Sequence, residues 1–433
     1  MIDFTLSPSQ RDLQQSTRTF AQTHLSTAPS LYSSHADQRS RFESILPLYR
    51  RAVSAGLVKA QIPVPLGGTN AGLVDAAIQI EELYAVETSV SLTIAGNGLG
   101  LTPLILAGSE EQKNVFLEPF LTGDGEPLAS LMHSEPGGTA NWLEKGGKGL
   151  QTTARKEADG NGWVINGEKL WTTNSSGWDS KGADVQCVVC RYSPDGSPQD
   201  PSADPASSIL ILIVTREIIA QNAPSAYTIL SEPELAGHVA VTGPHTRFTE
   251  FRVPETHLLC PPGTGAAVVE QTFASSAALV GAMAVGLMRA AFEAALKFAK
   301  EDSRGGAEPI IYHQSVADLL MDMKMRADSA RLVTWKALHC LQSSGPEIDF
   351  KTRLEGCLQA KIFGSEAAVQ CVVDGMKAVG MTSYKKDQPF TQLLNDAACL
   401  PLFDGGNVGI RRRQMEKIFQ QDGYKPWAAT YGV

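Results

Sequence analysis

The chain has 433 residues, a formal net charge of −9 and a hydrophobic fraction of 43%. This length allows a large core and two or three structural units, and the acidic balance argues against nucleic acid or an anionic membrane as a partner. No run of about 18 apolar residues is evident, so we expect no membrane span. Seven scattered cysteines suit a reducing compartment, and neither end carries an export or targeting signal, so we expect a cytoplasmic protein.

The first part of the chain has a helical pattern. Ser7-Pro8-Ser9-Gln10 supplies an N-cap and an early proline, and apolar residues then recur at helical spacing. A turn sequence at 62–68 interrupts the helices, and two apolar helical stretches follow at 73–85 and 89–106. We therefore predict an N-terminal α-helical domain over residues 1–126.

The pattern changes at about Pro127 to short runs rich in Val, Ile, Thr and aromatic residues, separated by Gly, Pro, Asn and Asp. The predicted strands are 128–132, 150–154, 163–171, 185–191, 209–214 and 239–253. Their spacing predicts a compact antiparallel barrel or sandwich, and we assign residues 127–260 to a central β-barrel domain. Cys187 and Cys190 lie in one of these runs and should point to opposite faces of the strand, which argues against a redox pair or a zinc site.

A helical pattern returns for residues 261–433, which we predict to form a C-terminal helical domain. Long apolar stretches at 272–301, 313–342 and 353–376 are typical of a four-helix bundle. The whole chain thus belongs to the α+β class. The histidines show no His-x-x-His or Glu-x-x-His spacing, so we predict no metal site.

Asp404 is the strongest candidate for a reacting group. A short apolar stretch that ends at Phe403 precedes Asp404, and two glycines, Gly405 and Gly406, follow it. Apolar surroundings raise the pKa of a carboxyl group, whereas a neighbouring guanidinium lowers it. If a helix begins near Asp404, Arg411 returns to the same face seven residues later and can reach back to the carboxylate. The glycines would let the backbone approach a flat ligand, so the stretch predicts a general base beside a cofactor.

The alternative interpretation of this stretch is structural. Asp is a favoured N-cap, and the arginines at 411–413 would then form a solvated helix face. The segment alone does not decide between the two.

Two segments of the predicted β domain suit a planar cofactor such as a flavin. The first joins a strand to a glycine-rich turn, and its candidate contacts are Leu131, Met132, His133, Ser134 and Thr139. The second ends a strand with an indole followed by hydroxyls, and its candidates are Trp171, Thr172 and Thr173. The alternative is that the indole is ordinary core and that the hydroxyls serve the turns. A third candidate is Arg304 beside two glycines, since such an arginine can bind a pyrophosphate in bidentate fashion; His313 and Gln314 follow it.

Taken together, the chain resembles the acyl-CoA dehydrogenase superfamily over its whole length. The motifs that carry this resemblance are Pro65-Leu66-Gly67-Gly68, Ser134-Glu135-Pro136, Gly167 to Asn174 (GEKLWTTN), Val253-Pro254, Arg304 with Gln314, and Gly380. Each motif is weak alone, but the ordered set is specific. Asp404 falls where the dehydrogenases usually carry their catalytic Glu.

An Asp at that position resembles the nitroalkane oxidase branch of the superfamily. Arg411 seven residues later, Ser276 in SSAAL, and the stretches LMHSEP, FDGGN and WAATYG all look like that branch. The resemblance implies FAD as cofactor, a helical, β-barrel and helical fold, and a homotetramer in which Arg304 and Gln314 reach the FAD of a neighbouring subunit. It also implies that Asp404 is the base, that Arg411 orients it and favours its ionised form, and that Ser276 hydrogen-bonds it.

Within the same resemblance, Thr173 is placed near the reactive flavin nitrogen, with Trp171 and the segment 131–134 against the ring. Two departures stand out. The dehydrogenases carry a Gln-containing glycine-rich loop near the cofactor, where this chain has DGMKAVG at 374–380; we keep Gly375 and Lys377 as candidate contacts. Thr173 also replaces a serine, which keeps the hydroxyl and adds a methyl group.

The implied activity is an FAD-dependent oxidase that converts a nitroalkane, with O2 and water, to an aldehyde or ketone, nitrite and hydrogen peroxide. An acyl-CoA dehydrogenase, or a related flavin oxidase acting on another acidic carbon, is the second hypothesis, and it requires a pocket for a pantetheine chain. A flavin-free helical scaffold or binding protein is the third, and a colourless purified protein would favour it.

Overall fold

The computed structural model describes residues 4–342 and 349–428. It begins with seven helices: α1 (Pro8–His24), α2 (Ala28–Tyr32), α3 (Gln38–Ser44), α4 (Leu46–Ser54), α5 (Leu73–Tyr84), α6 (Thr88–Ala107) and α7 (Glu110–Leu121). Ser7 is the N-cap of α1, as the sequence predicts, and the side chains of Ser7 and Gln10 form a reciprocal capping box there. Ser109 and Gln112 do the same for α7. Local side-chain chemistry therefore fixes where these helices begin.

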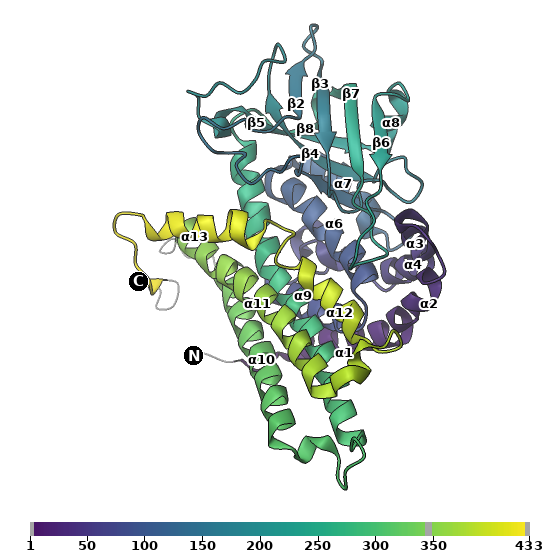
Figure 1. Ribbon diagram of the computed structural model, residues 1–433. Helices are drawn as coiled ribbons and strands as arrows, with labels where there is room; N and C mark the ends of the chain where they lie inside the picture. The colour runs from purple at the N-terminus through teal and green to yellow at the C-terminus, as the bar shows by residue number, and fades with distance from the viewer. Residues whose placement is uncertain (1–3, 343–348, 429–433) are drawn as a thin grey trace.

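One mixed sheet follows the helices and lies at one end of the molecule (Figure 1). Its strands are β1 (Ala129–Met132), β2 (Thr153–Lys156), β3 (Gly162–Lys169), β4 (Val185–Tyr192), β5 (Ile209–Thr215), β6 (Tyr227–Ser231), β7 (His245–Pro254) and β8 (Leu258–Cys260). The hydrogen-bonded order is β6-β7-β3-β2-β4-β5-β8, with β1 paired to β4. Cys187 and Cys190 of β4 belong to two separate core clusters, so they do lie on opposite faces.

The prediction of a closed antiparallel barrel is wrong. In the described part of the chain β6 pairs only with β7 and β8 only with β5, so the sheet is open, and β4 runs parallel to both β1 and β2. The sequence pattern missed β6, β8 and the short helix α8 (Arg216–Gln221). Their brevity explains the omission, because three to six residues give little periodicity. The strand predicted from residue 239 begins only at His245.

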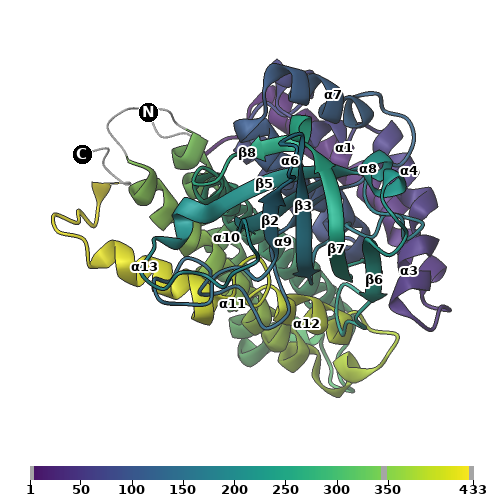
Figure 2. The ribbon, with the colours of Figure 1, turned by 90° about the horizontal axis from the view of Figure 1, so that it is seen from above.

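The C-terminal part is helical: α9 (Gly265–Glu301), α10 (Gln314–Gln342), α11 (Phe350–Val379), α12 (Phe390–Cys399) and α13 (Arg412–Phe419). The long helices α9, α10 and α11 run side by side below the sheet (Figure 1). Small residues allow close packing, since a Cβ added to Gly364 of α11 would lie 3.2 Å from the Cα of Gly281 in α9. Seen from above, α13 and the N-terminal helices lie on opposite sides of the molecule (Figure 2).

Two helices, α6 and α9, are long and apolar enough to cross a membrane by length and composition alone, contrary to the expectation from the sequence. More than half of the residues in each apolar stretch are buried inside the protein. Burial on all sides is typical of a core helix. The length and apolar composition of these two helices are therefore explained by their burial in the interior of this fold.

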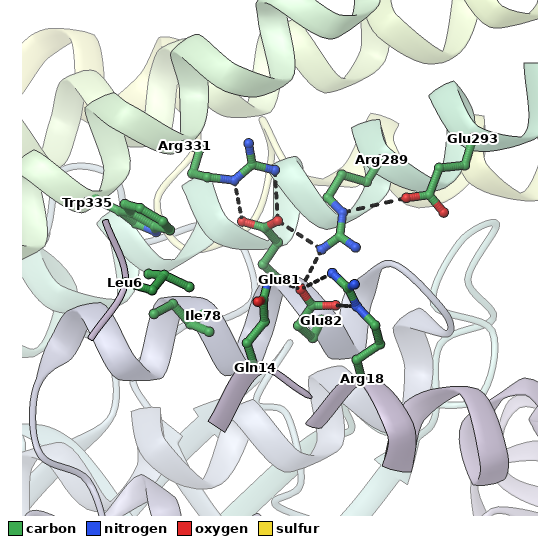
Figure 3. Close-up of a pocket in the computed structure, with 10 residues that line it drawn as sticks. All are labelled: Leu6, Gln14, Arg18, Ile78, Glu81, Glu82, Arg289, Glu293, Arg331 and Trp335. Atoms are coloured by element: carbon green, nitrogen blue, oxygen red, sulfur yellow. Dashed lines mark hydrogen bonds and ion pairs between the residues drawn. The ribbon is translucent and has the colours of Figure 1, made fainter. Parts of the chain in front are cut away.

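A cluster of ion pairs joins the N-terminal helices to the C-terminal bundle around a cavity of about 260 Å³ (Figure 3). Glu81 and Glu82 project from α5, and both are almost fully buried. Glu82 pairs with Arg18 of α1 at 2.9 Å and with Arg289 of α9 at 2.9 Å, and Glu81 pairs with Arg331 of α10 at 2.8 Å. Every charge of this cluster has an opposite partner, so the cluster is an inter-helix junction.

Candidate active site

Asp404 lies in the loop between α12 and α13, with its backbone in the left-handed region at φ 53°. Its side chain is only 4% exposed. The hydroxyl of Ser276, on α9, donates a hydrogen bond of 2.7 Å to Oδ1. The other carboxylate oxygen, Oδ2, is buried and has no hydrogen-bond partner among the described residues. Such an oxygen costs free energy when it is left unpaired, and it is free to accept a proton from a bound molecule.

Asp404 does not cap a helix, so the structural alternative for this stretch does not hold. The helical turn begins at Asn407 with Gly406 as its N-cap, and α13 continues from Arg412. The predicted helix start near Asp404 is therefore wrong by about one turn. Arg411 still reaches back, but by way of the wider π-helical turn Asn407–Arg411.

Arg411 is bonded to the backbone of Asp404 more than to its carboxylate. Its Nε and Nη2 groups donate to the Asp404 carbonyl oxygen at 3.0 and 2.6 Å, whereas Nη2 lies 3.5 Å from Oδ2. The guanidinium also lies over the ring of Phe273, at 5.6 Å from its centroid. Arg411 thus fixes the loop and places a positive charge beside a carboxylate oxygen that remains free to accept.

Gly405 is required by this arrangement. Its φ is 77°, and an added Cβ would lie 2.6 to 2.9 Å from the guanidinium of Arg411. Arg411 fills the space that a side chain at position 405 would take, which gives a packing reason for glycine here; close approach of a ligand to this backbone stays a prediction. Gly406 caps the following turn, and an added Cβ would meet the Leu402 carbonyl oxygen at 3.3 Å.

Burial is the largest influence on the Asp404 carboxyl group, and it raises the pKa of that group above its ordinary value. Arg411, the hydrogen bond from Ser276 and the nearby Lys361 oppose this effect in that order. The predicted action of Arg411 thus has the correct sign, although the net pKa shift is upward. Burial lowers the pKa of Arg411 in turn, and Asp404 opposes that shift. A carboxylate with a raised pKa is a stronger base than a solvated one.

The end of β1 lies against this site. His133 is buried, and its ring contacts the ring of Phe273 at a centroid distance of 5.3 Å. Phe273 is three residues before Ser276 on α9 and lies under Arg411. Burial, followed by the charge of Lys169, lowers the pKa of His133 to about 3, so its imidazole is neutral. Its Nε2 has no partner among the residues that the structure describes.

The end of β3 lies beside the end of β1, because the Leu170 amide donates to the Ser134 carbonyl oxygen at 2.9 Å. Trp171 follows with φ 64° and a side chain that is 56% exposed. Trp171 is therefore not core, and it presents an aromatic surface next to the site. Thr172 is buried and bonded to Ser175 at 2.7 Å, while the half-buried Thr173 hydroxyl has no hydrogen bond within the described ranges.

These features fit a planar cofactor with polar edges. An exposed indole, a hydroxyl at Thr173 and unpaired buried atoms on His133 and Asp404 lie on segments that are joined by the Leu170–Ser134 hydrogen bond and by the contacts of Phe273 with His133 and Arg411. Unpaired buried polar atoms are rare in proteins, and a bound heterocycle would supply their missing partners.

Comparison with known proteins places the chain in a family. Residues 7–124 and 263–418 match the families described as acyl-CoA dehydrogenase, N-terminal domain, and acyl-CoA dehydrogenase, C-terminal domain. The chain is 58% identical to a nitroalkane oxidase of Fusarium oxysporum and 50% identical to one of Podospora anserina, covering all of this chain and 98% and 99% of those proteins. A solved nitroalkane oxidase structure, an active-site mutant crystallized with 1-nitrooctane, matches with a TM-score of 0.97 and 57% identity over the full length of both chains.

The chain belongs to the nitroalkane oxidase branch of the acyl-CoA dehydrogenase family. The predicted family and its helical, sheet and helical fold are thereby confirmed, apart from the closure of the barrel. Part of one motif of the resemblance, residues 429–432 of WAATYG, lies outside the described residues.

The remaining predicted site residues lie in two other places of the chain. Thr139 is half-buried in the turn after β1. Arg304, His313 and Gln314 lie in or beside the connection from α9 to α10, at the end of the molecule opposite the sheet (Figure 1). Arg304 stacks on Phe298 at 4.5 Å and donates to the Val379 carbonyl oxygen. His313 and Gln314 are exposed.

Gly375 and Lys377 lie in the last turns of α11, so the sequence-based description of 374–380 as a loop is wrong. The helix continues to Val379. An added Cβ on Gly375 would lie 3.0 Å from both Met323 and Phe390, which gives this glycine a packing role between helices. Lys377 forms an ion pair of 3.0 Å with Asp374.

Two buried lysines of this chain were not predicted from the sequence. Lys169 of β3 is fully buried and donates to Glu135 at 2.9 Å and to the His133 carbonyl oxygen at 3.0 Å. Lys361 of α11 is fully buried near Asp404. A usable signal for Lys361 was its helical spacing from the buried residues Leu358 and Ser365.

Proposed function

We propose that this protein is a flavin-dependent oxidase that converts nitroalkanes, O2 and water to aldehydes or ketones, nitrite and hydrogen peroxide. The observation that carries the proposal is the Asp404 carboxylate: it is buried, one oxygen is held by Ser276, and the other is unpaired beside Arg411. Family membership at 58% identity over the whole chain supports the same activity. A nitroalkane has an acidic carbon next to its nitro group, and such a carbon needs only a well-placed carboxylate base.

The cofactor is FAD, as in this family, and the sequence-based prediction of FAD is confirmed. In our proposal Trp171 and the segment 131–134 lie against the ring, and the Thr173 hydroxyl contacts its polar edge. The buried pair of Lys169 and Glu135 fixes the backbone that carries His133, because Lys169 bonds both partners. When bound, FAD accepts the electrons of the substrate anion and passes them to O2.

The protein residues carry out the proton transfer. Oδ2 of Asp404 accepts the proton from the carbon that bears the nitro group, and the negative charge moves into the nitro oxygens. Ser276 holds Oδ1, so the carboxylate does not need to reorient during the transfer. Arg411 favours the ionised carboxylate before the reaction. It stays close to this carboxylate as proton transfer neutralises the negative charge there. Burial raises the pKa of Asp404. Asp404 therefore retains the proton from the substrate more readily than a solvated carboxylate would.

We further propose that Arg304 and Gln314 serve the cofactor of a neighbouring subunit in a homotetramer. Ser276 and Glu301 are twenty-five residues apart on the continuous helix α9, which is roughly 38 Å at 1.5 Å per residue. One cofactor ring cannot lie beside Asp404 and also near the far end of α9 in the same chain. Association of chains would bring the two regions together.

The test is to mix the purified yellow protein with nitroethane in air and to assay nitrite and hydrogen peroxide together. Equimolar nitrite and peroxide are expected. A protein that instead bleaches with an acyl-CoA thioester and releases no nitrite would act as an acyl-CoA dehydrogenase.

A further inference from the structure

Lys361 is a fully buried lysine that holds both flanks of the segment carrying Asp404. It projects from the middle of α11, and it is 0% exposed. Its Nζ group donates to the carbonyl oxygen of Leu400, four residues before Asp404, and to Oδ1 of Asn407 at 3.1 Å, three residues after it. One cation thus bridges the two ends of the loop.

Asn407 extends this attachment. Its Nδ2 group donates to Ser365 at 3.0 Å and to Glu366 at 3.1 Å, both on α11. Its backbone amide donates to the Pro401 carbonyl oxygen at 2.8 Å and closes the loop on itself. The loop is therefore fixed to one rigid helix at its start and at its end, with Asp404 between the two attachments.

Stability alone does not explain a cation at this place. Burying an ammonium group is costly, and an apolar side chain of similar size is often as stable or more so. Asp404, Cys399 and Glu366 favour the charged form of Lys361, while Arg411 opposes it. Burial outweighs these effects and lowers the pKa of Lys361 to about 8. In return, Lys361 lowers the pKa of Asp404 against the effect of burial.

We propose that Lys361 is a positioning residue of the reaction: it holds the segment Leu400–Asn407 so that the Asp404 carboxylate faces the substrate, and its charge favours the ionised carboxylate. This inference rests on the proposed nitroalkane oxidation. It assigns to the base a second cationic neighbour, which acts from behind the loop, in addition to Arg411.

The test replaces Lys361 with Met, which keeps the length and removes the charge. The FAD-loaded variant is assayed with neutral nitroethane and with the preformed ethyl nitronate anion, which needs no base. We expect kcat/KM for the neutral substrate to fall about 10- to 100-fold, while the anion is consumed within about threefold of the wild-type rate. The acidic limb of the pH profile should move to higher pH, because the carboxylate loses a favourable charge. Equal losses on both substrates, or an unmoved limb, would overturn the proposal.

Ser365→Ala is the matched control for a purely structural role. It removes one hydrogen bond of Asn407 but keeps the Lys361 charge, so a smaller loss with an unmoved acidic limb is expected. An acidic limb shifted as far as in K361M would show that loop disorder alone moves it, and would contradict the charge effect.

Thermal unfolding of the FAD-loaded protein gives a measurement that does not depend on activity. In a cycle of K361M, D404N and the double variant, we expect the double variant to lose less in Tm than the sum of the two single losses. Additive losses would overturn the coupling between Lys361 and Asp404. If the wild type releases no nitrite from nitroethane and the losses are still non-additive, the proposed substrate fails while the coupling stands.

Discussion

Replacing Gly405 with Ala tests how Arg411 and the Asp404 loop fit together. The added Cβ would lie 2.6 Å from Nε, 2.8 Å from Cζ and 2.9 Å from Nη2 of Arg411. The guanidinium has little freedom to move, because it is 3% exposed and donates twice to the Asp404 carbonyl oxygen. Ala at φ 77° adds about 1 kcal/mol of backbone strain, and hydrogen bonds to a charged group are worth about 1.5–3 kcal/mol each.

We therefore expect G405A to be destabilised by roughly 3 kcal/mol, as strain and at least one weakened hydrogen bond together suggest. Its kcat/KM for neutral nitroethane should fall about 100-fold, the effect of a displacement of about 1 Å near the reacting atoms. Unfolding in urea and steady-state nitrite release measure the two effects.

Gly423→Ala is the matched control. Gly423 has the same φ of 77°, but an added Cβ there meets no atom within 4 Å. It should show the backbone strain alone, of about 1 kcal/mol, with wild-type activity. If G405A behaves like G423A, the contact between Gly405 and the guanidinium does not hold Arg411 in place, and the account of this loop is refuted.

Three further predictions concern the base, the helix junction and the cofactor. In Ser276→Ala the Asp404 carboxylate loses a hydrogen bond that lowers its pKa, so the acidic limb of kcat/KM for neutral nitroethane should move to higher pH; an unmoved limb would argue against this hydrogen bond in the active enzyme. Glu82→Gln leaves Arg18 without its carboxylate and Arg289 with Glu81 as its buried partner, and it should cost about 2 kcal/mol in urea unfolding. Glu293→Gln, at a 66% exposed partner 3.8 Å from Arg289, should cost less than about 0.5 kcal/mol; equal costs would contradict the role of Glu82 in the junction. Removal of FAD should lower Tm and restoration of FAD should recover it, because a ligand of the native state stabilises that state; a Tm independent of FAD would place the cofactor outside the folded core.

The sequence predicted well those features that depend on local chemistry. The predicted N-cap at Ser7 fixes the start of α1 through its hydrogen bond with Gln10, three positions along the chain. The order of helices, strands and helices follows from a change in hydrophobic periodicity. By contrast, the hydrogen bond between Ser276 and Asp404 joins residues 128 positions apart, and only the family resemblance suggested it.

Features that depend on pairing between distant segments escaped the sequence. An open sheet and a closed barrel give the same alternation along each strand, and only the pairing of the terminal strands separates them. The open space at Gly405 is taken by Arg411, and spacing does not distinguish a side chain of the protein from a ligand. Lys361 is tolerated in the interior because Leu400 and Asn407, 39 and 46 positions away, supply its acceptors.

The central claim is that Asp404 is the base, and its most direct test is Asp404→Asn assayed with neutral nitroethane and with the preformed ethyl nitronate anion. The amide keeps the shape of the side chain but cannot accept the proton. We expect turnover of neutral nitroethane to fall by about 10²- to 10⁴-fold, the range for loss of a general base, and oxidation of the anion to stay close to the wild-type rate. A similar loss on both substrates, or full activity on nitroethane, would contradict the assignment.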